Sequence, residues 1–428
     1  DAQESRGLGD VYKRQVMINR RLFLSSAAGV GGMLSLGNVS FADEINKDEN
    51  QKSVLFLFLA GGATHIETFN PIPNAPSDRR SVTGHVKTNV PGMELGGLFK
   101  ELAKKGDQIS IFRGFHHRDS NHASATHWVV TGEANFGAGT TQKWPSYGSV
   151  VSGYHGTNAD NGLPHYVKVR SIQHDDAAWM GAKHMGYDAT REGRRDLQLS
   201  SEASRFKARL KTLEMIDKSF DSRGAGLAKE WTDLRAQAVK VLFGEAAKAF
   251  KIEQDKEYDN FKEQALGKEL LTSVRLIEAG SKFVTVSFGG WDMHNNIFNS
   301  LTQRQTVLDQ YLSKLIDLLE QRGLSEKTML VVTSEFGRTP KVNSNGGRDH
   351  WSNLAPLLIS SKSHTMGRVV GKSSVNAETV DEGECFPEDL RWTMFDHLGI
   401  DRHMKWTSTD GRPMTMVKED AKNILTEL

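Results

Sequence analysis

The stretch KFVTVSFGGWDMHNN, residues 282–296, joins an apolar run directly to a polar turn. Its first seven residues are rich in β-branched and aromatic side chains, a composition that is typical of a buried strand. Two glycines then lead into Asp292 and His294. A strand that ends on an acid and an imidazole has two interpretations, a polar turn or a metal site at the rim of a sheet.

Other apolar runs of strand length alternate along the chain with helical patterns. Strands are expected at residues 53–60, 108–115, 163–169, 282–288, 328–334 and 355–360, and helices at 121–132, 301–323 and 387–400. Either Ser120 or Asn121 is expected to cap the helix that ends at Gly132. Alternating strands and helices predict a three-layer α/β/α sandwich around a mostly parallel central sheet.

Composition narrows the class of protein. The chain has 428 residues, 38% of them hydrophobic and 25% charged, as in a soluble globular protein of one large or two ordinary domains. A formal net charge of +1 does not indicate the basic surface that nucleic-acid-binding proteins usually have. No apolar run reaches the roughly 18–20 residues of a membrane span. Cys385 is the single cysteine, which excludes an internal disulfide and a Cys-based zinc ribbon.

The N-terminal region resembles an export signal. Residues 17–42 contain Arg20 and Arg21 before a modestly apolar stretch and the sequence SFA, which suits signal peptidase. The pattern resembles a twin-arginine signal, and an ordinary secretory signal remains an alternative. We expect an exported protein, in the periplasm, at the cell envelope or outside the cell. Residues 1–16 resemble translated adapter sequence, so we expect a non-native extension before Met17.

The remainder of the chain is expected to form one domain, residues 53–428. Its section at about 200–280 contains no proline and many Ala, Lys, Glu and Leu residues. This composition predicts a helical insertion that caps the domain or packs on its side.

Chemically active side chains follow several of the predicted strands. In open α/β sheets, functional residues gather beyond the carboxyl ends of the strands. The residues found there are His65, Ser120, Asn121, His122, Asp292, His294, Glu335, Arg338, Arg348, Asp349 and His350. Imidazoles with carboxylates are ligands for zinc, manganese or iron, and an open coordination position would activate water. Arginines beside such a site would suit an anionic substrate.

Several segments resemble the bacterial exported family called domain of unknown function 1501. They include LLTSVRLIEAGSKFVTVSFGGWDMHNN, TSEFGRTPKVNSNGGRDHW, FPEDLRWTMFDHLGI, FLFLAGGATHIETFNPIP and NHASATHWVVTG. The resemblance runs from about residue 54 to the C-terminus. This family is similar to the alkaline phosphatase and sulfatase superfamily, which implies a central mixed sheet between helical layers and a metal-dependent ester hydrolase ancestry.

The resemblance also implies roles for single residues. Asp292, His294 and His350 match one metal site of the superfamily, and Glu335 stands at the Asp of its Asp–His pair. The loop before Asn121 stands where the superfamily places its nucleophile, so Ser120 and Asn121 are candidate catalytic residues. The chain departs from the pattern at Phe336, where a histidine is expected, and at residues 60–62, where a metal-binding aspartate is expected. His65 or Glu67 are the residues that would compensate for that aspartate.

These observations predict an exported, metal-dependent hydrolase of phosphate or sulfate esters with one intact metal site. Its expected partner is an anionic ester, a polysaccharide ester among the candidates. The expected metal ligands are Asp292, His294, His350, Glu335, His65 and Asp349; the catalytic residues are Ser120, Asn121 and Glu335; and the substrate-binding residues are Arg338, Arg348 and His122. The alternative is a non-catalytic exported binding or structural protein on the same scaffold.

Overall fold

The computed structural model describes residues 51–134, 144–156, 158, 162–189, 245–407 and 411–428. The chain divides into two units, of which the larger comprises residues 49–156, 164–190 and 251–428. The larger unit holds the sheet and the candidate site. The described residues of the smaller unit include the short 3-10 helix η4, Glu245–Phe250. The predicted extension (1–16), the predicted export signal (17–42) and residues 200–244 of the predicted insertion lie outside the described residues.

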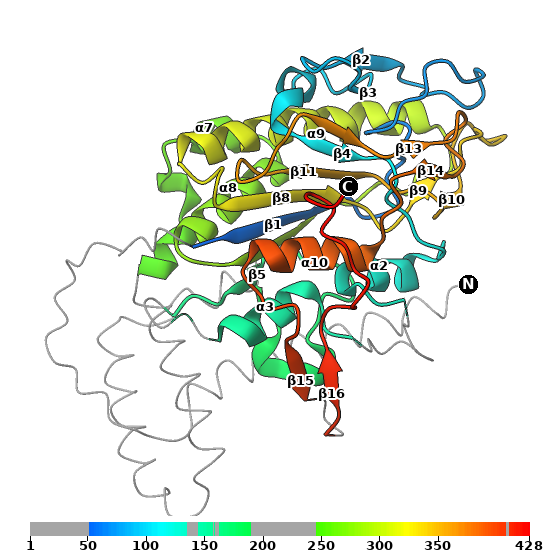
Figure 1. Ribbon diagram of the computed structural model, residues 1–428. Coiled ribbons are helices and arrows are strands. Elements are labelled where there is room, and N and C mark those ends of the chain that lie inside the picture. Colours follow the sequence, from blue (N-terminus) through cyan, green and yellow to red (C-terminus); the bar gives the residue numbers. More distant parts are fainter. Residues whose placement is uncertain (1–50, 135–143, 157, 159–161, 190–244, 408–410) are drawn as a thin grey trace, which may run out of the picture. The chain divides into compact units, whose positions relative to one another are not determined.

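The larger unit is built on an eight-stranded sheet (Figure 1). Its order is β12-β4-β11-β8-β1-β7-β5-β6. The strands are β1 Ser53–Phe58, β4 Ser110–Phe112, β5 Tyr166–Lys168, β6 Tyr187–Asp188, β7 Phe283–Ser287, β8 Thr328–Thr333, β11 Leu357–Ser360 and β12 Arg368–Val370. β11 is antiparallel to both of its neighbours, and every other pair in this sheet is parallel. The predicted mostly parallel central sheet is therefore confirmed.

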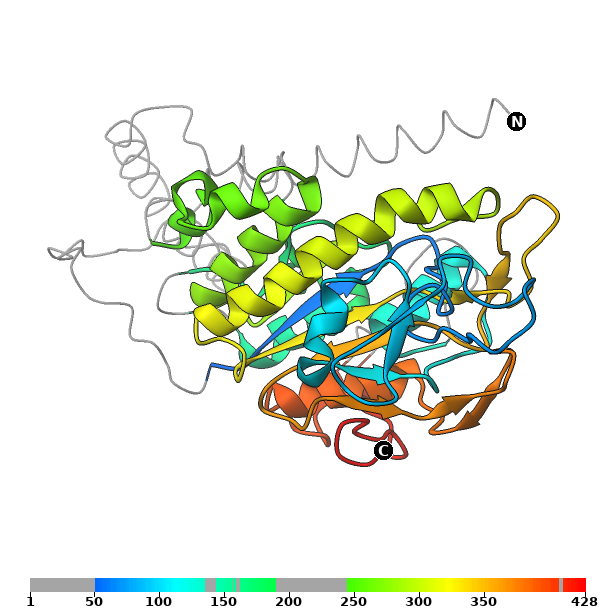
Figure 2. The same ribbon diagram turned by 90° about the horizontal axis from the view of Figure 1, so that it is seen from above.

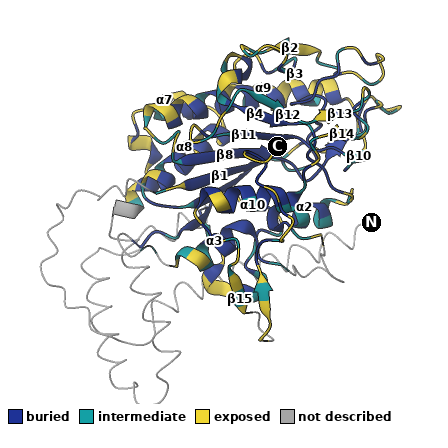
Figure 3. Cartoon of the chain, viewed as in Figure 1, coloured by how far each residue is buried: buried dark blue, intermediate teal, exposed yellow. Residues whose placement is uncertain are grey.

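β1 is the centre of this sheet because its side chains are apolar on both faces. It pairs in parallel with β7 and β8, so that Leu55 lies between Val284 and Leu330. All six of its residues are buried, as the dark strands of Figure 3 show. A strand with one apolar face would leave the other face to water, whereas this continuous apolar run requires a helical layer on each side.

Helices supply those two layers (Figure 2). One face carries α8 (Ala265–Glu278) and α9 (Ile297–Gln321), and the other carries α2 (His122–Thr131), α3 (Tyr147–His155) and α10 (Pro387–His397). Val54, Phe56 and Phe58 share a buried core with side chains of α2, α3 and α10. The three-layer α/β/α architecture is confirmed. α8 belongs to a helical layer of the domain, although it lies within the section predicted as an insertion.

Two helix termini behave as their sequences predict. Asn121 caps α2, because its Oδ1 accepts hydrogen bonds from the backbone N–H groups of Ala123 and Ser124. Gly132 ends α2 in the left-handed conformation, with φ of 72°. α9 begins four residues earlier than predicted, since the N–H of Ile297 bonds to the carbonyl of Gly346 and orders the preceding turn.

Short elements that carry no periodic pattern complete the unit. They are the strand pairs β2 His85–Lys87 with β3 Glu94–Gly96, β9 Gly337–Arg338 with β10 His350–Trp351, β13 Lys372–Ser373 with β14 Val380–Glu382 and β15 Lys405–Thr407 with β16 Pro413–Thr415, and the helices η1 Leu102–Gln108, η2 Ala178–Met180, η3 Ala182–His184, η5 Ile252–Gln254 and α7 Tyr258–Phe261. None of the helices in the described ranges combines the length and the apolar character that crossing a membrane requires.

Candidate metal centre

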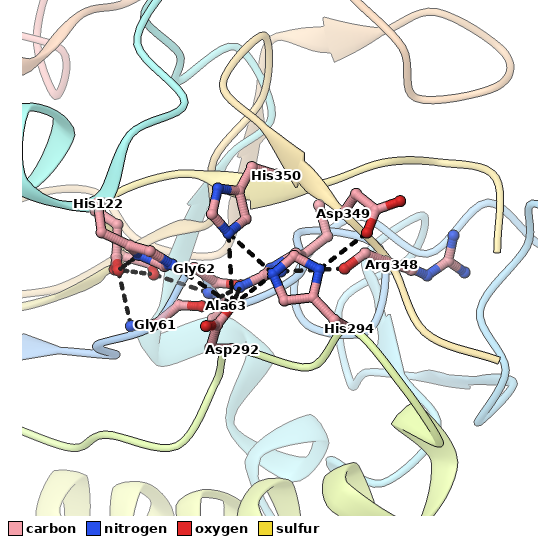
Figure 4. A network of polar contacts seen from close by, with 12 residues as sticks. Gly61, Gly62, Ala63, His122, Asp292, His294, Arg348, Asp349 and His350 are labelled. Carbon is pink, nitrogen blue, oxygen red and sulfur yellow. Dashed lines mark hydrogen bonds and ion pairs between the residues drawn. The ribbon is translucent and has the colours of Figure 1, made fainter. Parts of the chain in front are cut away.

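Polar side chains converge where β1, β7, β8 and the chain after β4 leave the sheet (Figure 4). The antiparallel strand β11 enters at this same edge, so the segment that precedes it also reaches the site. Within that segment β10 pairs with β9, which sets His350 opposite Arg338. Residues far apart in sequence are therefore brought together by the parallel sheet and by one reversed strand.

One carboxylate oxygen is the centre of the cluster. Asp292 Oδ1 lies 2.9 Å from His294 Nε2 and 3.5 Å from the Nε2 atoms of both His122 and His350. Arg338 Nη2 donates to it at 2.5 Å. Partial burial disfavours the charged form, but the hydrogen bond and charge of Arg338 lower the pKa of Asp292 below its usual range. The side chain is 50% exposed, so the carboxylate is ionised and open to solvent.

Each of the three imidazoles is held through its Nδ1 atom. The Nδ1–H of His122 donates to Glu335 Oε1 at 2.8 Å, and that of His294 donates to Asp349 Oδ1 at 2.9 Å. The His350 Nδ1–H donates to the backbone carbonyl of Ser120 at 2.8 Å. Because a carbonyl or carboxylate only accepts, each neutral ring carries its lone pair on Nε2. In His122 and His350 this atom faces Asp292 Oδ1, whereas in His294 it also accepts from Arg338 Nη1.

The donor set fits a divalent cation. His294 Nε2 and His350 Nε2 face each other at 3.1 Å, and among the described residues His122 Nε2 is a buried atom with no hydrogen-bond partner. Ligand atoms of His122, Asp292 and His350 all lie within 4.8 Å of one another. Two imidazoles and one carboxylate are a common ligand set for zinc and for iron, with positions left for water or substrate.

His122 was predicted to bind substrate, and the structure brings it into this ligand group instead. It is the first residue of α2, and its ring contacts Asp292, which follows β7, and Glu335, which follows β8. The hydrogen bond that His122 donates to Glu335 raises the pKa of His122, against the effect of partial burial. The paired carboxylate therefore makes this ring a stronger base than an isolated histidine.

Arg338, which was predicted to bind the substrate anion, uses all of its donors within the protein in this structure. Its side chain is fully buried. Nε donates to the carbonyl of Gly62 at 2.7 Å, and Nη1 donates to the carbonyl of Arg348 and to His294 Nε2. Nη2 donates to Gly61 and to Asp292. All five N–H bonds are thus used inside the protein.

Arg348, also predicted to bind the substrate, lies away from the cluster in a closed ion pair. Its guanidinium and Glu67 are both fully buried, with Nη2 and Oε1 2.9 Å apart. Its other hydrogen bonds go to the backbone carbonyls of Thr339, Pro340, Arg79 and Arg80. This arginine holds the loops around residues 79 and 340 together.

The structure does not bring His65, a predicted metal ligand, into the cluster. Its Nε2 bonds to the carbonyl of Ala377 at 3.2 Å, and burial lowers the pKa of the ring to about 3. A Cβ added to Gly337 would lie 2.3 Å from His65 Nδ1, so the ring is enclosed on that side as well. Since Glu67 is committed to Arg348, neither candidate replaces an aspartate after β1.

Glu335 and Asp349 orient histidines and do not point a free oxygen at the cluster as ligands. The buried Glu335 accepts from His122 and from the N–H of Gly61 through Oε1, and from Ser334 through Oε2. The exposed Asp349 accepts from His294 and, at 3.1 Å, from the amide of Asn343. Partners of this kind fix the ring orientation and the tautomer of a ligating histidine.

Two supporting features could be recognised only in the folded chain. The buried ring of His117 donates to the backbone carbonyl of Glu335 and so fixes the end of β8. Gly61, with φ of 114°, lets the turn after β1 approach the turn after β7, because a Cβ there would lie 2.6 Å from the backbone nitrogen of Asp292. The sequence signals were a histidine after β4 and a double glycine after β1.

Ser120 and Asn121 serve the site through their backbone and helix cap. The Ser120 hydroxyl donates to the Ser352 hydroxyl at 3.0 Å, while its carbonyl holds His350. The Asn121 side chain is committed to capping α2. Their catalytic participation remains a prediction.

Fold and site together define an α/β protein with a metal-type ligand cluster at the carboxyl edge of its sheet. The chain matches the family described as "Protein of unknown function (DUF1501)" over residues 51–428, and it belongs to that family. The resemblance seen in its sequence segments is thereby confirmed. No curated protein matches the chain.

Several solved structures are distantly similar. The PsFucS1 sulfatase from Pseudoalteromonas sp. is 13% identical, with a TM-score of 0.43 over 88% of this chain and 72% of that one. The lipoteichoic acid synthase LtaP from Listeria monocytogenes is 10% identical, with a TM-score of 0.36 over 90% and 79%. The phosphonate monoester hydrolase SpPMH from Silicibacter pomeroyi is 11% identical, with a TM-score of 0.34 over 82% and 74%. Similarities this distant say nothing about the reaction.

Proposed function

We propose that this protein is a metal-dependent hydrolase of phosphate or sulfate esters that uses one divalent ion, either zinc, manganese or iron. The observation that carries the proposal is the arrangement around Asp292 Oδ1, where the Nε2 lone pairs of His122 and His350 converge. Two imidazole electron-pair donors gathered beside a carboxylate repel one another unless a cation lies between them.

A divalent ion at this site would supply a Lewis acid and a water of lowered pKa. His122, Asp292 and His350 would hold it, and their distances leave part of the coordination sphere to solvent. Glu335 and the carbonyl of Ser120 keep two of the rings in the required tautomer. The half-exposed Asp292 keeps the site accessible from outside.

A non-catalytic binding protein is the second candidate, and one observation favours it. Arg338 and Arg348 donate their hydrogen bonds to groups of the protein, so neither guanidinium has a pair of N–H donors free for an ester anion. A hydrolase of anionic esters usually presents such donors to the charge that develops in the transition state. Under this alternative the site holds a metal but does not turn over a substrate.

Metal content and hydrolysis distinguish the two candidates. The chain from Asp43 would be purified without chelator beside His350→Ala. His403→Ala would be the control, because His403 is exposed and lies between α10 and β15, which carry no residue of the cluster. Metal would be measured by elemental mass spectrometry. Turnover would be measured with 4-nitrophenyl phosphate, 4-nitrophenyl sulfate and a sulfated polysaccharide, each with zinc, manganese or iron added.

The hydrolase proposal expects about one ion per chain and turnover of at least one ester, both lost in His350→Ala and both kept in His403→Ala. One ion per chain without turnover of any ester would favour the binding protein. A folded chain that takes up no ion would contradict both candidates.

We further propose that the protein is exported through the Arg20–Arg21 signal. The proposal rests on the sequence of residues 17–42. Replacing both arginines by lysine keeps the positive charge but removes the twin-arginine pattern. The variant is expected to accumulate inside the cell, as measured by fractionation. Unchanged export of the variant would point to the general secretory route.

A further inference from the structure

We propose that Arg338 is a built-in cation at the metal centre and that His294 serves this arginine and not the metal. The site would then hold a single ion on His122, Asp292 and His350. This inference rests on the proposed metal site and specifies which residues bind the ion and how many ions fit.

The guanidinium of Arg338 is held from both sides. Three of its five N–H bonds go to backbone carbonyls, those of Gly61, Gly62 and Arg348. These carbonyls belong to the turn after β1 and to the strand segment before β10, so they fix the planar group in place. The remaining two N–H bonds go to Asp292 and His294. An arginine stays protonated at every physiological pH, so this positive charge is permanent.

His294 has no electron pair to spare for an ion in this arrangement. Its Nδ1–H donates to Asp349, and its Nε2 accepts from Arg338 Nη1 at 3.2 Å. A neutral imidazole has one lone pair, which the arginine takes here. Among the described residues, His122 and His350 accept no hydrogen bond from Arg338. Asp349, His294, Arg338 and Asp292 therefore form a continuous chain that positions the carboxylate of Asp292.

The same arginine leaves no room for a second ion on its side of Asp292. A Cβ on Gly62 would lie 3.1 Å from Arg338 Nη2 and 2.3 Å from the ring of Phe336, so the space beside the guanidinium is already filled. A second dication at that position would also meet a fixed positive charge within a few ångströms. The open direction is that of His122 and His350.

The test is metal binding by four forms of the full chain: wild type, His294→Ala, His350→Ala and the control His403→Ala. Stoichiometry would be measured with excess zinc, and the ligand environment by the visible absorption of bound Co²⁺. We expect one ion in the wild type and in His403→Ala. His350→Ala should bind at least about 100-fold more weakly, because it loses a direct ligand.

His294→Ala should keep one ion per chain and the Co²⁺ spectrum of the wild type, with affinity weaker by about tenfold or less. Its side chain is 40% exposed, which favours a folded variant. If His294→Ala does not fold, His294→Asn keeps a donor towards Asp349 and carries the same test. Arg338→Lys, which keeps the charge but loses the fork, should also bind one ion.

Loss of the ion in His294→Ala, or a Co²⁺ spectrum altered as in His350→Ala, would overturn this inference and leave the proposed function standing. Two ions in the wild type would do the same. A wild-type chain that binds no ion would overturn the proposed function and this inference together.

Discussion

Two fully buried arginines, Arg338 and Arg348, lie beyond the carboxyl ends of the central strands, and their carboxylate partners differ in exposure. Arg348 pairs with Glu67, which is as buried as the arginine itself and also accepts from Ser81 and Val82. Arg338 pairs with Asp292, which is 50% exposed and shares one oxygen with three imidazoles.

The difference separates a structural ion pair from a functional one. Every donor and acceptor of the Arg348–Glu67 pair is directed at the protein, so this closed pair ties loops together. In the Arg338–Asp292 pair only the arginine is buried, and the carboxylate is half exposed. The carboxylate remains available to histidines and to a ligand, so the open pair positions the site. Burial of the carboxylate, and not of the arginine, distinguishes the two.

The largest expected effect comes from breaking the closed pair. Arg348→Ala should lower the free energy of unfolding by about 3–5 kcal/mol, because it leaves the Glu67 carboxylate buried and uncompensated. Denaturant unfolding would measure the change. The double variant Arg348→Met/Glu67→Leu should cost less than the sum of the single variants, since it removes both charges.

The matched variant of the open pair is Asp292→Asn. Because the side chain is half exposed, water can replace part of what is lost, and we expect less than half of the Arg348→Ala destabilisation. Equal losses for the two variants would refute the division into a closed and an open pair.

The second-largest effect is expected from acid, which should lower the free energy of unfolding through the buried His65. Burial, with a smaller contribution from the charge of Arg348, lowers the pKa of His65 to about 3. His65 is therefore protonated near pH 6.5 in the unfolded chain but only at about pH 3 in the folded chain. Stability from this residue is present above pH 6.5 and is lost as the pH falls, by up to about 1.4 kcal/mol per unit.

His65→Gln keeps a donor for Ala377 but cannot be protonated. Between pH 6.5 and 4, unfolding of this variant should take up about one proton fewer than unfolding of the wild type, so its free energy of unfolding should change less steeply with pH. Parallel pH profiles for the two proteins would show that His65 does not contribute to acid unfolding.

An intermediate effect on metal affinity is expected for Glu335 and Asp349, the carboxylates that accept hydrogen bonds from His122 and His294. Glu335→Gln weakens the acceptor of His122, a proposed ligand, and should lower metal affinity about 10- to 100-fold. Asp349→Asn weakens the acceptor of His294 and should lower it less than about threefold, since His294 is not a proposed ligand. Metal titration by calorimetry would compare the two, and a larger effect for Asp349→Asn would reverse their assigned roles.

The smallest effects are expected at the start of α2. Asn121→Ala removes the helix cap and should destabilise the protein by about 1 kcal/mol in thermal or denaturant unfolding. Ser120→Ala keeps the carbonyl that holds His350, so metal affinity should stay within about twofold. Loss of ester turnover in Ser120→Ala with metal binding intact would instead support this serine as the nucleophile.

The fold could be predicted because its central strands are continuous apolar runs between amphipathic helices. The two-residue strands β9 and β10 could not, since a pair of residues has no periodicity to recognise. They matter nonetheless, because their pairing sets His350 beside Arg338.

The site could be predicted in part. The strand-end rule selected Asp292, His294 and His350, which the structure brings together. Arg338 and Arg348 were assigned to the substrate because sequence shows the charge of an arginine but not whether its donors are already used. His122 was assigned to the substrate because its direction depends on the cap of α2, and His65 to the metal because sequence does not show which way a loop turns after two glycines.

The pairing of β1 has a consequence for the order in which the molecule folds. β1 ends at residue 58, yet its partners are residues 283–287 and 328–333. A nascent chain must therefore hold an apolar strand unpaired until more than two hundred further residues have been made, and closing so long a loop is entropically slow. Folding should wait for nearly the whole chain, and a truncated chain that ends before β8 should aggregate through the exposed edge of β1.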